Sequence, residues 1–141
     1  MKKIKVIWCI VSVSIMALIF FFSSQTATES SDTSGRFATL LAKALGSIFQ
    51  GEALESVMSL CQFIVRKGAH FILYTILGIS VFNSLPQSGR WTRFVIAVGI
   101  CILYAISDEV HQTFVDGRSG EIRDVFVDGA GSLAGVFVMR N

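Results

Sequence analysis

The sequence predicts an all-α membrane protein: a four-transmembrane-helix bundle with an additional amphipathic interfacial helix in the first extracytoplasmic loop. Hydrophobic residues make up 52% of the 141-residue chain and charged residues only 16%. This composition leaves too little polar surface to cover a soluble globule. The apolar residues also form runs long enough to cross a hydrocarbon layer. The length suits one domain, residues 1–141, and neither a repeat nor a domain boundary is visible.

The first predicted span covers residues 4–22 and follows three lysines, Lys2, Lys3 and Lys5. About 19 residues give a helix of about 28 Å, which is enough to cross a membrane. The basic start also fits a secretory signal peptide. The apolar run is too long for one, however, and it ends in three phenylalanines rather than in a small-residue cleavage site. We therefore favour an uncleaved span.

The segment after this span divides into a predicted loop and a predicted helix. Residues 23–35 are rich in Ser and Thr and show no apolar periodicity, which indicates a loop. Apolar residues then recur at helical spacing from Phe37 to Phe49, with Ser34 as a candidate N-cap and Gly51 as a candidate stop. This helix is too short and one-sided to span, so we expect it to lie in the membrane interface or over the bundle as a lid.

Three further spans are predicted, at about residues 63–85, 92–108 and 121–139. A helix start at Glu52 leads into the second span, and a turn around Pro86 separates the second span from the third. In the fourth span, Gly131 and Gly135 form a GxxxG pair. Small residues at this spacing let helices approach closely, either within the bundle or in a homodimer.

Four spans would divide the charged residues between two sides of the membrane. One side receives six basic residues and no acidic ones: Lys2, Lys3, Lys5, Arg90, Arg93 and Arg140. The other side receives six basic residues and all ten acidic ones. The second set is spread over long loops and helix interiors, where the positive-inside rule is weak. We therefore expect both termini in the cytoplasm and a polar site on the extracytoplasmic face.

The densest polar stretch, residues 104–128, lies between two apolar runs and holds six of the ten acidic residues. Asp108 and Gln112 share a helix face with His111, since they are spaced by three or four residues. Asp124 and Asp128 share another face. A matching stripe in the second span carries Arg66, His70 and Tyr74, beside Lys67. Charges at membrane depth are costly unless they are paired or reach water, and they mark functional sites more often than surface charges do.

Three interpretations of these charges are open. In the first, the basic residues pair with the acids and hold the bundle together: Arg66, Lys67, Arg118 and Arg123. In the second, the histidines and acids bind a divalent metal, or act as acid and base on a lipid-linked headgroup. In the third, the basic residues hold an anionic group without bond breaking. The spacing matches no metal motif such as HExxH, so no metal ligand is assigned and the cofactor is unknown. A net charge of +2 without a Lys/Arg block gives no indication of nucleic-acid binding.

Three motifs resemble the VanZ-like family of membrane proteins: Arg66-Lys67-x-Ala69-His70, Asp108-Glu109-x-His111-Gln112 with Gly117-Arg118, and Asp124-x-x-x-Asp128. The resemblance covers nearly the whole chain. It implies a small multi-pass protein of the bacterial plasma membrane. Founding members of the family are linked to low-level resistance to teicoplanin, a glycopeptide antibiotic that acts at the cell surface. The chain departs from the family pattern at Leu73, where an acid is frequent, and at Asp116, where a proline is frequent.

The sequence thus supports two hypotheses about function. In the first, the polar cluster binds, and in one version modifies, an anionic envelope lipid or a lipid-linked peptidoglycan precursor. In the second, the protein is a non-enzymatic scaffold whose charged cluster is structural. The catalytic candidates are Asp108, His111, Asp124 and His70. The ligand-binding candidates are Arg66, Lys67, Tyr74, Glu109, Gln112, Arg118 and Asp128.

Overall fold

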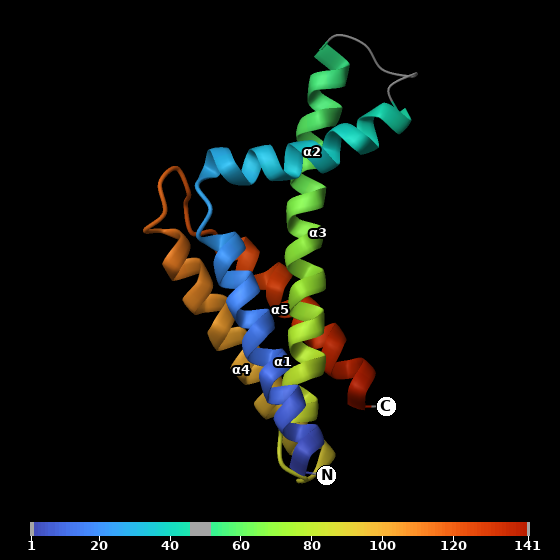
Figure 1. Ribbon diagram of the computed structural model, residues 1–141, viewed down its shortest axis with the longest axis vertical. Coiled ribbons are helices and arrows are strands. Elements are labelled where there is room, and N and C mark those ends of the chain that lie inside the picture. The colour runs from blue at the N-terminus through green and yellow to red at the C-terminus, as the bar shows by residue number, and fades with distance from the viewer. Residues whose placement is uncertain (1, 46–51, 141) are drawn as a thin grey trace.

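The computed structural model describes residues 2–45 and 52–140, and these residues form five helices and no strand. The helices are α1 (Lys2–Ser23), α2 (Ala27–Leu45), α3 (Glu52–Ser84), α4 (Arg90–Gln112) and α5 (Ile122–Arg140). The predicted all-α class is confirmed. In Figure 1, α1, α3, α4 and α5 form a bundle, and α2 lies across one end of it.

Three helices are long and apolar enough to cross a membrane: Lys3–Ser23 of α1, Glu55–Ser84 of α3, and α4 over Arg90–Gln112. The 19-residue α5 is not among them. Its first turns carry Arg123, Asp124 and Asp128, which interrupt its apolar sequence. The fourth span therefore stays a prediction.

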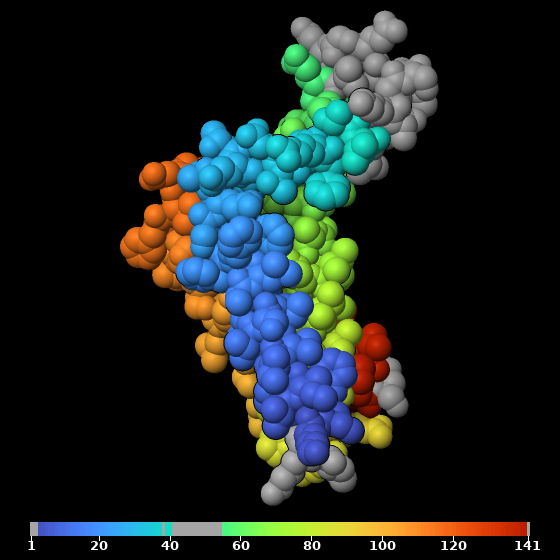
Figure 2. All heavy atoms as spheres, viewed as in Figure 1, coloured from blue at the N-terminus to red at the C-terminus, as the bar shows by residue number. Residues whose placement is uncertain are grey.

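Apolar and charged side chains are distributed as in a protein surrounded by lipid. The outer face of α1, prominent in Figure 2, exposes Ile4, Val6, Ile7, Ile10 and Val13 by 57–64%. The carboxylate residues Asp108, Glu109 and Asp128 are instead only 1–5% exposed. Water would favour the opposite arrangement, because burying a charge is costly and exposing a large apolar surface is unfavourable. The molecule is a membrane protein on this ground as well as on helix length.

The predicted loop over residues 23–35 is wrong, because helix α2 already begins at Ala27. The Thr26 backbone N–H donates to the Glu29 carboxylate at 2.9 Å, and the Glu29 N–H donates to the Thr26 hydroxyl at 3.3 Å. This reciprocal capping box starts the helix. Its hydrogen bonds also lower the pKa of Glu29. Ser34 is consequently no N-cap; it lies inside α2 and donates to the Ser30 carbonyl at 2.8 Å. Gly51, the candidate stop, lies outside the described residues.

Helix α2 packs on α3 across the end of the bundle (Figure 1). Phe37 and Leu40, two residues of its predicted apolar face, are 58% and 66% exposed. Such exposure suits a helix lying in an interface, and the interfacial placement stays a prediction.

Helix α3 is the centre of the bundle, and its most extensive contacts are with α5. Three glycines allow the two backbones to approach closely: Gly78, Gly131 and Gly135. A Cβ atom at Gly131 would lie 2.5 Å from the Phe71 carbonyl oxygen, and one at Gly135 only 2.1 Å from that of Thr75. The predicted GxxxG pair is thus used for helix packing within one chain. A homodimer through it stays a prediction.

The rest of the core joins α1 and α4 to α3. The Tyr104 hydroxyl donates to the Met16 carbonyl at 2.6 Å, and the Ser12 hydroxyl donates to that of Ser80 at 3.0 Å. Both chain ends lie toward the end of the bundle opposite α2, whereas the loop between α4 and α5 lies beside α2 (Figure 1). We call the end with this loop and α2 the polar end.

Candidate functional site

Arg118, in the loop between α4 and α5, joins three segments at the polar end. Its guanidinium donates to the Ser23 carbonyl at 3.0 Å, the Gln112 side-chain carbonyl at 3.2 Å and the Ser30 hydroxyl at 2.9 Å. Just before it, Gly117 has φ +73°, a left-handed conformation that suits glycine in a tight turn. All three acceptors are neutral, so within residues 2–45 and 52–140 the Arg118 charge contacts no carboxylate directly.

Burial lowers the pKa of Arg118, and the positive charge of the nearby Arg66 lowers it further. The carboxylates of Asp108, Glu109 and Asp124 act in the opposite direction. Arginine stays protonated under all ordinary conditions. Because burial and the Arg66 charge both disfavour the charged guanidinium, an additional anion beside Arg118 would stabilise it.

The acids of α4 are held by neighbours on other segments. Asp108 Oδ2 accepts from the Ser23 hydroxyl at 2.7 Å and from the Gln112 amide at 3.3 Å. Glu109 accepts from the same amide at 3.0 Å and from the Glu121 backbone N–H at 2.8 Å. Gln112 thus spans both acids through one amide nitrogen and accepts from Arg118 through its oxygen. This network fixes the end of α4 to the loop and to α1.

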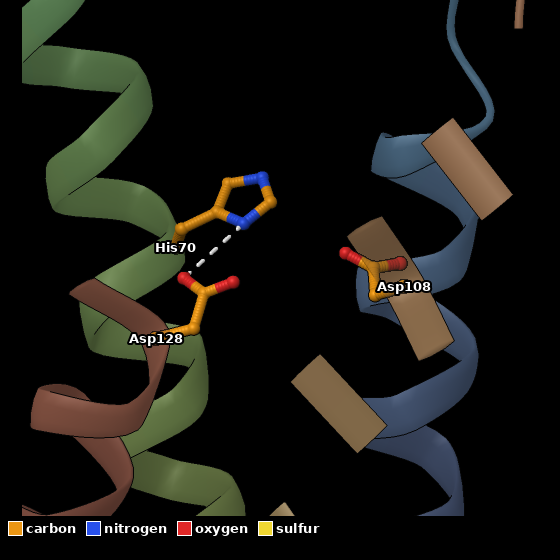
Figure 3. A group of neighbouring side chains, drawn as sticks. All are labelled: His70, Asp108 and Asp128. Atoms are coloured by element: carbon orange, nitrogen blue, oxygen red, sulfur yellow. Dashed lines mark ion pairs between the residues drawn. The ribbon is translucent and has the colours of Figure 1, made fainter. Parts of the chain in front are cut away.

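Three side chains from three helices face one another just inside this network: His70 of α3, Asp108 of α4 and Asp128 of α5 (Figure 3). One ligand atom of each lies within 4.8 Å of the others. We call this group the His–Asp–Asp cluster. His70 Nδ1 lies 3.6 Å from Asp128 Oδ1, an ion-pair distance too long for a hydrogen bond. Among the described residues, both Asp128 oxygens and Asp108 Oδ1 are buried without a hydrogen-bond partner.

Only one of the predicted structural ion pairs is formed among the described residues. Lys67 pairs with Asp124 and joins α3 to α5. Arg66, Arg118 and Arg123 make no ion pair with the acids of α4 and α5 within the described part of the chain. The pairing interpretation therefore accounts for one cation of the four.

Two adjoining cavities open at the polar end. The polar cavity, of about 160 Å³, is lined by Arg66, Lys67, His70, Gln112, Arg118 and Asp124, with Ala27, Gly117, Ser119 and Glu121. The apolar cavity, of about 150 Å³, lies under α2 and is lined mainly by Phe22, Phe37, Val65, Ala69 and Leu73, with hydroxyl residues of α2. Arg66, His70 and Arg118 line both cavities. A cationic junction with an apolar compartment on one side suits an amphiphile.

The predicted site residues separate into three groups. Arg66, Lys67, His70, Gln112, Arg118 and Asp124 line the polar cavity. Asp108 and Asp128 belong to the His–Asp–Asp cluster, which shares His70 with the cavity. Tyr74, Glu109 and His111 line neither cavity. Tyr74 is fully buried beside the His70 ring, and the His111 ring packs on Phe20 with centroids 4.3 Å apart.

Residues of α2 in and beside the site were missed because their segment was predicted as a loop. Ser30, Thr33 and Ser34 line the apolar cavity. The Thr26-x-x-Glu29 pattern, a known signature of a helix start, was the signal that could have found them. The Ser23 hydrogen bond to Asp108 brings the end of α1 to the 104–128 stretch.

Comparison with known proteins agrees with the motifs of the site. The family model described as VanZ/LLP1 matches residues 8–141, nearly the whole length. No curated protein and no solved structure matches the chain at a significant level. The match includes most of the first long apolar helix, the whole of the other two, and every residue of the two cavities and the His–Asp–Asp cluster. The chain is a membrane protein that belongs to the VanZ/LLP1 family.

Proposed function

We propose that the paired cavities bind an anionic, phosphate-bearing membrane lipid, with its headgroup in the polar cavity and the start of its alkyl chains in the apolar one. Envelope phospholipids and lipid-linked peptidoglycan precursors share this chemistry. The observation that carries the proposal is Arg66. It lines both cavities, it is exposed, and it has no ion-pair partner among the described residues.

The surroundings of Arg66 support an anion rather than a cation as the ligand. Arg118 and Lys67 line the same polar cavity. Guanidinium groups donate paired hydrogen bonds that match phosphate oxygens. Lys67 is already paired with Asp124, so Arg66 and the remaining N–H groups of Arg118 are the donors open to a headgroup. The carboxylates of Glu121 and Asp124 at the same cavity would orient a headgroup carrying hydroxyl or amine donors.

The membrane setting of this proposal includes a fourth span formed by α5, cytoplasmic termini and the plasma membrane of a bacterium. The close packing of α5 along α3 supports the span, because it would carry α5 through the same layer. Both termini lie away from the polar end (Figure 1). If the termini are cytoplasmic, the site at the polar end is on the extracytoplasmic face. Family membership supports a link to glycopeptide susceptibility, through the lipid that the site would hold.

Native mass spectrometry of the purified full chain tests the proposal. Phosphatidylglycerol should bind at lower concentration than the neutral phosphatidylcholine. Arg66→Gln should weaken phosphatidylglycerol binding about 10-fold, which corresponds to about 1.4 kcal/mol for one charge-assisted contact. Arg123→Gln, an exposed arginine at the same end but outside both cavities, should leave binding unchanged.

Inorganic phosphate distinguishes a lipid site from a simple phosphate site. Because the apolar cavity adds contacts that phosphate lacks, millimolar phosphate should displace little bound lipid. Equal binding of the two lipids, or equal loss in both variants, would refute the proposal.

A further inference from the structure

The His–Asp–Asp cluster holds more acidic groups than basic ones. It brings two carboxylates and one imidazole together, and Asp108 and Asp128 are 2% and 1% exposed. Lys67 forms its ion pair with Asp124 rather than with a carboxylate of the cluster. Three of the four carboxylate oxygens are buried and have no hydrogen-bond partner in the described part of the chain. Leaving such atoms unpaired in a protein interior costs several kcal/mol, which is why buried carboxylates normally have partners or coordinate a metal.

We propose that His70, Asp108 and Asp128 bind a divalent first-row transition-metal ion of the zinc type. Three protein ligands of the imidazole and carboxylate classes, with one coordination position left for another ligand, are the usual set of an open zinc site. An imidazole in the set favours such an ion over Mg²⁺ or Ca²⁺, which prefer oxygen alone. The proposal goes beyond the lipid site and does not depend on it.

The geometry of the cluster fits this ion with one adjustment. Metal–ligand bonds of about 2.1 Å in a tetrahedron separate the ligand atoms by about 3.4 Å. The 3.6 Å between His70 Nδ1 and Asp128 Oδ1 is already close to that spacing. The atoms of the full set lie within 4.8 Å, so Asp108 would move toward the other two. Figure 3 shows the His70 ring and the Asp128 carboxylate lying together, with the Asp108 carboxylate across the gap from them.

The neighbours of Asp108 would orient it as a ligand. Ser23 and Gln112 hold its Oδ2 atom, which leaves the buried Oδ1 atom available. Hydrogen bonds of this kind commonly orient carboxylate ligands of a metal. The ion would join α3, α4 and α5 at the polar end. Because His70 also lines both cavities, the ion would lie beside them and add positive charge at their inner wall.

Cobalt titration of the purified full chain, after treatment with a chelator, tests the metal site without any lipid readout. One Co²⁺ per chain should bind and give the visible absorption of a tetrahedral site, and Zn²⁺ should displace it. Asp128→Asn should weaken Co²⁺ binding more than 100-fold. Ser23→Ala, which removes only an orienting hydrogen bond, should weaken it about 10-fold. Asp116→Asn, an exposed acid on the neighbouring loop, should have no effect.

Unfolding in the presence of a chelator separates metal loss from misfolding. Without metal, Asp128→Asn should unfold near the temperature of the original chain, because the amide has the size of the carboxylate and the change removes one ion pair, with His70. Added Zn²⁺ should raise the unfolding temperature of the original chain alone, as expected for a ligand that binds the folded state. If Asp128→Asn does not fold, Asp108→Asn provides the same test. Absence of stoichiometric Co²⁺ binding to the original chain, or unchanged binding in either Asn variant, would overturn the proposal.

Discussion

The two halves of the α3–α5 interface hold the same pair of helices together in different ways. Toward the polar end, the contacts are between ionisable groups: Lys67 with Asp124 and His70 with Asp128. Toward the other end, the backbones meet at glycines, with Gly135 against Thr75 and Gly78 against Ser132. Among the described residues, the first half keeps buried carboxylate oxygens without hydrogen-bond partners, whereas the second brings the two backbones into close contact.

We infer from this difference that the glycine half stabilises the bundle and that the polar half binds a ligand. Close packing through small residues is an effective way to join helices in lipid, where the hydrophobic effect does not drive helices together. Charged groups in the same setting are costly, and they are tolerated where they bind a ligand or an ion. The glycine half provides the rigid frame on which the polar half is built.

The largest effect on stability is expected from Gly135→Ala. The new Cβ would lie 2.1 Å from the Thr75 carbonyl oxygen, so the two backbones must separate. We expect a loss of about 2–3 kcal/mol of unfolding free energy, typical of overpacking. Gly68→Ala is the control on α3, because nothing lies within 4 Å of its Cβ position. It should be neutral or stabilise by up to about 1 kcal/mol through helix propensity. Equal effects of the two changes in detergent unfolding would contradict this account of the glycine half.

An intermediate effect is expected from Ser23→Ala in the polar half. The change removes the 2.7 Å hydrogen bond to Asp108 and leaves Gln112 as the only donor to that carboxylate among the described residues. We expect a loss of about 1–2 kcal/mol for a buried, charge-assisted hydrogen bond. Ser24→Ala, an exposed neighbour whose hydroxyl bonds the Phe20 carbonyl, should change stability by less than about 0.5 kcal/mol. A smaller loss for Ser23→Ala than for Ser24→Ala would show that Asp108 does not need this donor.

The smallest effect is expected from the Lys67–Asp124 ion pair, whose side chains are 16% and 20% exposed. A double-mutant cycle with Lys67→Met and Asp124→Asn should give a coupling of about 0.5–1 kcal/mol. Salt should reduce it, because the pair reaches the solvent at the polar cavity. A coupling free energy larger than the stability loss of Gly135→Ala would contradict the view that the glycine half contributes more to stability than the polar half.

The sequence predicted the helices and the gathering of polar residues better than it predicted individual contacts. Long apolar runs identify α1, α3 and α4. The i, i+4 spacing predicted that Asp124 and Asp128 share one face, and in the structure both contact α3. The start of α2 was missed because Ser and Thr obscure apolar periodicity, although Thr26 and Glu29 carried the capping signal. Which acid meets which cation depends on helix rotation and loop geometry. Arg118, for example, bonds carbonyl and hydroxyl groups rather than carboxylates.

We propose that Arg66 binds a ligand and does not stabilise the fold. The direct measurement follows Arg66→Gln and Arg118→Gln for both unfolding free energy and phosphatidylglycerol affinity, in the same detergent. Arg66→Gln should lose about 10-fold in affinity and keep its stability, because the exposed Arg66 has no ion-pair partner among the described residues. Arg118→Gln should lose both, since its guanidinium holds Ser23, Ser30 and Gln112. Full lipid affinity in Arg66→Gln, or a loss of stability as large as that of Arg118→Gln, would contradict the account.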